Sequence, residues 1–138
     1  MPGTAVRRWI VTAAAVWCFL IVAAPLWHVE LIYKFFSSIC HQIPARSWHI
    51  GGEPLGVCIR CTSIYFGFLL SLVVGMKCDR RWLQVSFAAT AIEILLAFVI
   101  VDSLVLRSLT GLALGAAVAP FVVAGVEELL LGDAHELV

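Results

Sequence analysis

The residues of this chain that could carry out chemistry are cysteines and histidines gathered in two short stretches. Cys40-His41-Gln42 forms the first stretch, and Cys58-Ile59-Arg60-Cys61 forms the second. Thiolates and imidazoles are ligands of soft metal ions, and paired thiols also carry out redox reactions. The two stretches therefore predict either a metal site or a redox-active group of thiols.

The second stretch places two thiols one helical turn apart. Cys58 and Cys61 lie three positions apart at the start of an apolar run, so a helix beginning there brings both sulfurs onto one face. The N-terminus of that helix and the neighbouring Arg60 both favour the thiolate over the thiol. A metal-ligand pair and a redox-active dithiol both need these conditions.

The first stretch could complete a ligand set. We expect the metal ligands to be Cys40, His41, Cys58 and Cys61, although neighbouring residues point in different directions. One ion would therefore take both Cys40 and His41 only with local distortion, and His49 is a replacement. Such a set suits Zn²⁺ best, with Cu(I) or an iron–sulfur cluster as rivals. A disulfide between Cys40 and Cys58 or Cys61 is the purely structural alternative.

The composition indicates a protein built for lipid. The 138 residues are 62% hydrophobic and 13% charged, about half of the usual charged share of ~25%. With ~20 residues per span, the chain has room for about four transmembrane helices and no second soluble domain. Its net charge of zero gives no indication of a nucleic-acid partner.

Four apolar runs predict an all-α fold, an integral membrane four-helix bundle that forms a single transmembrane domain over residues 1–138. No segment shows the alternating pattern of a transmembrane barrel strand. The first run exceeds the ~7–15 residues of a signal-peptide core, so we expect it to be retained. The predicted spans cover residues 9–27, 58–76, 82–101 and 104–126.

The segment between the first two spans is predicted to hold a short interfacial helix and a Cys/His-containing loop. Apolar residues at helical spacing predict this helix, or else an extension of the first span, over residues 29–41, and Pro44 ends it. Gly51-Gly52 and Pro54 then shape a turn that returns the chain to the bilayer at Cys58.

The distribution of Lys and Arg predicts the orientation of the spans. The excess is mild and favours a multi-pass protein of the cell (inner) membrane with both termini in the cytoplasm. The loop over residues 28–57 and the turn over residues 102–107 then face outward. With four spans, the Cys/His cluster shares one membrane face with Asp102 and Arg107, whichever way the protein is inserted.

Several polar residues are further candidates for function. A carboxylate deep in the bilayer, as expected for Glu93, costs at least ~2.5 kcal/mol unless it is neutralised or paired. It is therefore either protonated and hydrogen-bonded inside the bundle or part of an ion or proton path. Asp102 is either a ligand or the cap of the last helix. The catalytic candidates are Cys58, Cys61, Asp102 and Glu93, and the cofactor-binding candidates are Gln42, Arg46, Arg60 and Arg107.

Two stripes of small residues recur at every fourth position of predicted spans. They are Ser63, Gly67, Ser71 and Gly75 in the second span, and Gly111, Gly115 and Ala119 in the fourth. Such stripes let helix backbones approach closely. The contact is either within one chain or between two, and a homo-oligomer would use Gly111/Gly115 or Gly67/Ser71.

A family resemblance ties the polar blocks together. Cys40-His41-Gln42-x-Pro44-x-Arg46-Ser47 and Cys58-x-Arg60-Cys61-Thr62-x-x-Tyr65-x-Gly67 resemble the signature of a family of small prokaryotic membrane proteins of unknown function. That family has a third block, which is similar here to Asp102, Arg107, Thr110-Gly111 and Gly115. The family usually has Gly where this chain has Ser63. The resemblance, over about residues 36–116, implies that the three blocks form one unit, and it brings no activity.

Together these patterns predict a membrane protein with a soft-metal site at its outer face, and zinc is the metal expected first. The site would serve metal handling, transport or metal-dependent catalysis, and whether the protein is an enzyme is left open. One alternative is a membrane thiol–disulfide oxidoreductase that passes electrons to a quinone. The other is a non-catalytic assembly or interaction subunit that uses the small-residue stripes. Besides the metal ion, the partner expected in every case is the lipid bilayer.

Overall fold

The computed structural model describes residues 2–99 and 103–132, and it is mostly helical. The described elements are α1 (Pro2–Trp27), α2 (Glu30–Ser37), the short 3₁₀ turn η1 (Pro44–Arg46), β1 (His49–Ile50), β2 (Glu53–Pro54), α3 (Ile59–Val74), α4 (Arg80–Val99) and α5 (Leu104–Gly132). Asp102, a candidate from the sequence, lies outside the described residues. The four long helices coincide with the four predicted spans to within a few residues at most ends, and α1 and α5 run furthest beyond them.

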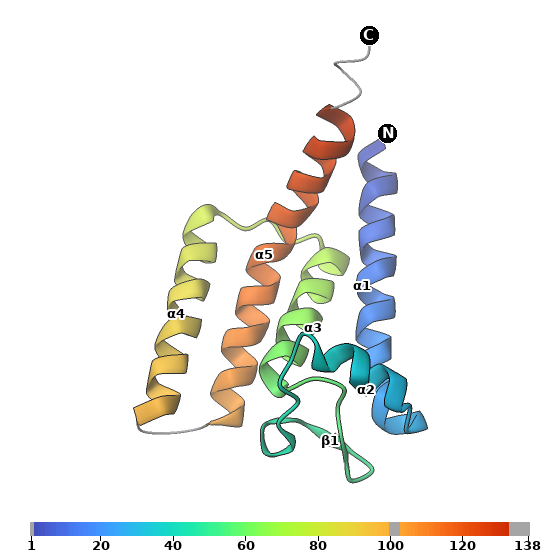
Figure 1. Cartoon of the computed structure of the whole chain (residues 1–138). Coiled ribbons are helices and arrows are strands. Elements are labelled where there is room, and N and C mark those ends of the chain that lie inside the picture. The colour runs from blue at the N-terminus through green and yellow to red at the C-terminus, as the bar shows by residue number, and fades with distance from the viewer. Residues whose placement is uncertain (1, 100–102, 133–138) are drawn as a thin grey trace.

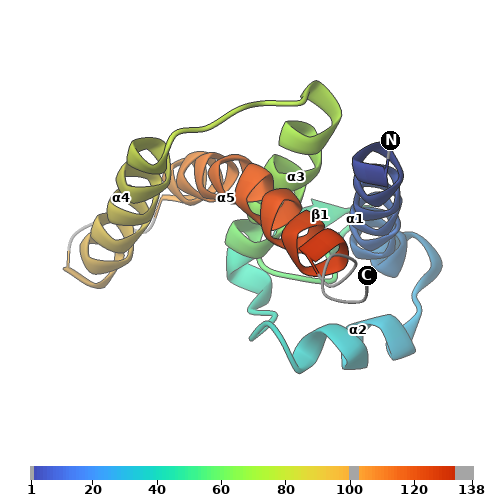
Figure 2. The ribbon, with the colours of Figure 1, turned by 90° about the horizontal axis from the view of Figure 1, so that it is seen from above.

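The four long helices lie side by side in the order α4, α5, α3, α1 (Figures 1 and 2). The closest packing is between α3 and α5, while α4 packs on α5, and α1 packs on both α3 and α5. The helix α2 and the β1–β2 hairpin lie together near the end of α1 and the start of α3, at the bottom of the view in Figure 1. Residues that are distant in sequence therefore meet at that end.

Two of the described helices are long and apolar enough to cross a membrane. They are the segments Ala5–Trp27 of α1 and Leu104–Leu130 of α5, whereas the apolar helix Ile59–Val74 is shorter. Large apolar side chains lie exposed on several helices, including Trp9 of α1, Val99 of α4 and Leu129 of α5. Exposed apolar surface of this extent is expected where lipid rather than water surrounds a protein.

The small-residue stripes hold α3 and α5 together within one chain. A Cβ atom added to Gly67 would lie 2.3 Å from the backbone oxygen of Leu112, and one added to Gly115 would lie 2.0 Å from the backbone oxygen of Ile64. No side chain fits between backbones at these distances, so glycine is required at both contacts. The expected helix packing is therefore found between two helices of the same chain.

The end of the molecule that carries α2 has its own small core. Phe36 of α2 is fully buried and packs edge-on against Trp17 of α1, with 5.4 Å between the ring centroids. A helix is present where the interfacial helix was predicted, but Glu30–Ser37 is shorter than the expected 29–41. The hairpin was not predicted, because its strands have only two residues each. Gly51 (φ +63°) and Gly52 (φ +91°) form its turn, and two successive positive φ angles are typical of a tight hairpin turn.

Candidate metal centre

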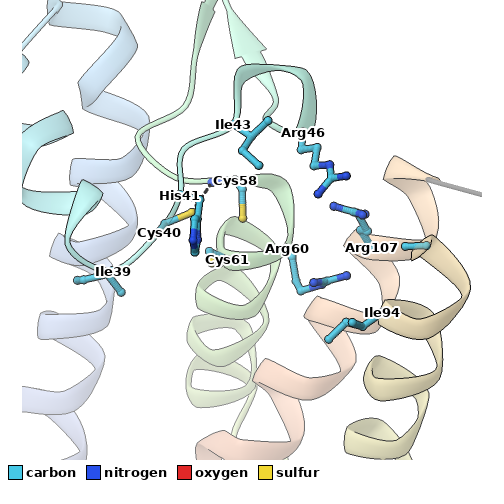
Figure 3. Close-up of a pocket in the computed structure, with 11 residues that line it drawn as sticks. Ile39, Cys40, His41, Ile43, Arg46, Cys58, Arg60, Cys61, Ile94 and Arg107 are labelled. Atoms are coloured by element: carbon cyan, nitrogen blue, oxygen red, sulfur yellow. Dashed lines mark hydrogen bonds between the residues drawn. The ribbon is translucent and has the colours of Figure 1, made fainter. Parts of the chain in front are cut away.

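Three cysteines from two separate segments converge beside the first turn of α3. Cys40 follows α2, and its backbone N–H donates to the backbone oxygen of Phe36 over 2.9 Å. Cys58 directly precedes α3, and Cys61 lies in its first turn. The backbone N–H of Cys58 donates to Cys40 Sγ over 3.3 Å (Figure 3), which joins the two segments at the cluster itself.

The sulfur atoms are close enough to share one metal ion. The Sγ atoms of Cys40, Cys58 and Cys61 all lie within 4.8 Å of one another. Tetrahedral zinc with Zn–S bonds of about 2.3 Å places its sulfurs about 3.8 Å apart. Movement of each sulfur by less than about 1 Å would therefore bring the three into bonding geometry. All five cysteines of the chain are free thiols in the structure, so the expected alternative of a disulfide is not seen here.

The local hydrogen bonds favour a thiolate at Cys58. The thiol of Cys61 makes the largest contribution to lowering the pKa of Cys58 to about 5. Burial acts in the opposite direction, and the backbone N–H of Cys61, the thiol of Cys40 and the backbone of Arg60 lower the pKa further. The thiolate is both the metal ligand and the nucleophilic form of cysteine.

The other sulfur and imidazole groups lie outside this cluster. His41 lines the same cavity as the cysteines but does not belong to the group of mutually close donor atoms. His49 lies on β1 and lines a different cavity, so it does not replace His41. Cys18 is buried within α1, and Cys78 lies between α3 and α4, at the end of α3 remote from Cys58.

An open cavity of about 500 Å³ adjoins the three sulfurs. In Figure 3 the cysteines and His41 lie on one side of it, and Arg46, Arg60 and Arg107 lie on the other. These arginines come from η1, α3 and α5, so three parts of the chain contribute guanidinium groups. The full described lining is Ile39, Cys40, His41, Ile43, Arg46, Cys58, Arg60, Cys61, Ile94, Ala97 and Arg107. The structure thus brings three of the four cofactor-binding candidates to the predicted metal ligands.

Glu93 of α4 is buried and ion-paired with two of these arginines. Its side chain is only 3% exposed, and its Oε2 atom accepts a hydrogen bond from Nη2 of Arg60. Its Oε1 atom lies 3.5 Å from Nε of Arg107. The carboxylate is therefore compensated by charge, which is one of the ways a deep acidic group can be tolerated. It does not line the cavity but holds two side chains that do.

Gln42, the remaining cofactor-binding candidate, has a different position. Its Nε2 atom donates to the backbone oxygens of Tyr33 over 2.8 Å and of Gly56 over 2.7 Å. The side chain therefore links α2 to the segment that leads into α3. Gln42 is absent from the described cavity lining, and in this structure it acts on the loop that carries Cys40.

Comparison with known proteins supports the membrane assignment. Residues 40–121, more than half of the chain, match a family described as "Predicted membrane protein (DUF2085)". The chain belongs to this DUF2085 family. The DUF2085 match includes both cysteine stretches, Glu93 and the arginines of the cavity. "Uncharacterized protein MJ1492" of Methanocaldococcus jannaschii is 44% identical over 43 residues, which are 31% of this chain and 28% of that protein. The alignment thus covers well under two thirds of that relative's length. No solved structure matches this chain.

Reasoning from the sequence did not find the partners of Glu93. The charge of Arg60 and Arg107 and the expected depth of Glu93 mark these residues as candidates, but no spacing rule relates three residues on three different helices. The sequence feature that could have predicted these ion pairs is the need of the Glu93 carboxylate for positive charge. Among apolar runs, a buried carboxylate requires a cation, and Arg60 and Arg107 each lie in the first turn of a predicted span.

Proposed function

We propose that this DUF2085 protein binds a soft metal ion through the thiolates of Cys40, Cys58 and Cys61 at the outer end of its helices. The observation that carries the proposal is the convergence of three sulfur atoms within 4.8 Å of one another. Three thiolates form most of a zinc site, and zinc is the ion that such a donor set suits best. Cu(I) is a rival for the same three sulfurs, whereas iron–sulfur clusters usually need a fourth cysteine.

The open side of the cluster favours a metal ion with a catalytic or transport role over a structural one. Structural zinc sites have four protein ligands, whereas catalytic sites keep one position for water or substrate. Here three sulfurs adjoin a cavity of about 500 Å³. We therefore propose metal handling, transport or metal-dependent catalysis, with the ion open to the cavity. His41, which lines the same cavity, is the residue that could close the site after a local movement.

In the proposed topology this site lies at the face of the membrane that is turned away from the cytoplasm. We propose that α3 and α4 cross the membrane together with α1 and α5, and that both termini lie in the cytoplasm. The protein would then be a multi-pass protein of the inner membrane. The support is the coincidence of these helices with apolar runs and the mild excess of basic residues on the side of the termini.

The test is the metal content of the purified protein. The protein is purified in mild detergent without added metal or chelator, and bound metals are measured by elemental mass spectrometry alongside free thiols. One zinc or copper ion per chain is expected, with thiols blocked until a chelator is added. The double variant Cys58→Ser/Cys61→Ser should lose the ion. Cys78→Ser is the matched control, since it removes a thiol outside the cluster, and it should retain the ion. Unchanged metal in the double variant would refute the proposal.

A second candidate is a membrane thiol–disulfide oxidoreductase coupled to quinone. It is favoured by the lowered pKa of Cys58 beside two further thiols. In that reaction the Cys58 thiolate and the Cys61 thiol are oxidised to a disulfide, and the two electrons, the proton of Cys61 and one proton from water reduce a quinone to the quinol. Cys40 would then exchange disulfides with the pair. Purification without metal, together with a disulfide that is reversibly reduced, would favour this function, and quinone reduction would be the next assay.

A further inference from the structure

The wall of the cavity opposite the sulfurs is built from guanidinium groups. Arg46, Arg60 and Arg107 all line it, and no described acidic side chain does (Figure 3). Arg107 is buried, while Arg46 on η1 is exposed, so the wall extends from the interior to the surface. A metal ion held by the three cysteines would therefore face a set of N–H donors.

Arg60 has donor capacity beyond its ion pair. Its Nη2 atom donates to Glu93, while its Nε atom is buried and has no hydrogen-bond partner among the residues that the structure describes. A guanidinium group carries five N–H donors in a planar fork. Arg60 lines the cavity, so the N–H groups that Glu93 does not use can serve an acceptor that enters it.

The charge of the proposed metal site explains why cations are needed beside it. Three thiolates exceed the charge of Zn²⁺ by one negative unit, so a fourth ligand that is itself anionic would be repelled. Guanidinium groups across the cavity offset that repulsion. They also match the oxygen atoms of a phosphate-like group in pairs, which a neutral ligand would not use.

We propose that the cavity binds a phosphate-type oxyanion group, with one oxygen on the metal and others accepting hydrogen bonds from Arg60 and the neighbouring guanidinium groups. This inference rests on the proposed metal site and names the ligand class that the site takes. A volume of about 500 Å³ exceeds that of a bare phosphate, and ligand pockets typically have ~300–1,000 Å³. The group therefore belongs either to a free oxyanion or to a larger molecule such as a lipid with a phosphate headgroup.

The test uses cobalt in place of zinc in the full-length protein in detergent. A thiolate-to-cobalt charge-transfer band reports the three-cysteine site, and the d–d bands report the fourth ligand. Titration with inorganic phosphate should change the d–d bands in a saturable manner. Arg60→Gln should weaken this response at least about tenfold, the usual scale for a lost hydrogen bond to a charged group. Arg81→Gln, an exposed arginine at the start of α4, is the matched control and should behave as the unmodified protein does.

Further experiments test whether a variant fails to fold, which molecule supplies the oxyanion group, and which of the two proposals fails. Arg46→Gln removes an exposed cavity arginine and should weaken the response even if Arg60→Gln fails to fold. Nanodiscs of phosphatidylcholine with and without phosphatidic acid test a lipid source. A change that occurs only with phosphatidic acid assigns the site to a headgroup. Absence of the charge-transfer band would refute the metal site itself. If the band is present but neither phosphate nor phosphatidic acid alters the d–d bands, or if the arginine variants respond normally, the oxyanion inference is wrong.

Discussion

Cys40 and His41 are neighbours in sequence with different relations to the sulfur cluster. Cys40 Sγ belongs to the group of mutually close sulfurs, whereas the His41 ring does not. We expect Cys40→Ser to lower metal affinity by more than the ~10–100-fold that loss of a supporting partner costs. His41→Ala should keep the metal stoichiometry. Competition with a chromophoric chelator measures both, and loss of metal in His41→Ala alone would place the imidazole in the coordination shell.

Glu93 compensates two buried or partly buried cations at once. Removal of its carboxylate leaves Arg60 and Arg107 without that counter-charge, and breaking a buried ion pair typically costs ~3–5 kcal/mol. We therefore expect Glu93→Ala to lower the free energy of unfolding by about this amount in detergent. Thermal and denaturant unfolding measure the change.

The control for that variant is Glu128→Ala on α5. Glu128 is exposed, and such substitutions usually change stability by less than ~0.5 kcal/mol. Equal stability of the Glu93 and Glu128 variants would show that the buried pairs do not stabilise the fold.

At the residue scale, the sequence was most informative where chemistry and spacing coincide. The spacing of Cys58 and Cys61 on one helical turn predicted their pairing, and the paired sulfurs are within the cluster. Cys40 could be named but not placed, because its position depends on how α2 packs against α1. The objection to joint coordination by Cys40 and His41, that adjacent side chains diverge, agrees with the structure. Asp102 lies outside the residues described, so its role stays a prediction.

Between the elements, the closest contact is that of α3 with α5. A Cβ atom at Gly115 would lie 2.0 Å from a backbone oxygen of α3, so no side-chain rotation can relieve the overlap. We expect Gly115→Ala to destabilise the protein by at least the ~1–3 kcal/mol typical of overpacking. Gly125→Ala on the same helix meets no atom within 4 Å and should be neutral or stabilising by up to ~1 kcal/mol through helix propensity. Thermal unfolding of the two variants, side by side, gives the comparison.

The loop that carries Cys40 depends on Gln42. Its side chain donates to two backbone oxygens, and both would lose this partner in Gln42→Ala. Each unsatisfied buried group costs ~1–3 kcal/mol. We expect the variant to lower metal affinity by about tenfold or more, as loss of groups that orient ligands does. Chelator competition measures this effect. Gln84→Ala, an exposed glutamine on α4, should leave the affinity unchanged.

The long helices could be predicted from sequence because each is one apolar run of sufficient length. The hairpin could not, because β1 and β2 have two residues each and gain their stability from contacts made elsewhere. One such contact is the hydrogen bond that Tyr33 Oη donates to the backbone oxygen of Pro54 over 2.6 Å. Gly51-Gly52 correctly indicated a turn, but a turn signal alone does not reveal which residues pair across it.

For the whole molecule, topology is the open prediction that can be tested directly. Cys78 lies beyond the end of α3 that is remote from the cluster, and Glu53 lies exposed in the hairpin near the cluster. If α3 crosses the membrane with the termini inside, an impermeant maleimide should label Glu53→Cys in intact cells. Cys78 should react only after the membrane is opened. Labelling of both positions from the same side would show that α3 does not cross.

The distribution of the site along the chain has a consequence for biosynthesis. All three clustered cysteines lie within residues 40–61, whereas Glu93 and Arg107 lie on α4 and α5. Domains and segments made first can fold first during translation. The sulfur cluster can therefore assemble before α4 and α5 have left the ribosome, and a nascent chain could acquire the proposed ion before Arg107 joins Arg46 and Arg60 at the cavity and Glu93 pairs with Arg60. A chain truncated after α3 would be the natural intermediate of this order, loaded with metal but lacking part of its cavity.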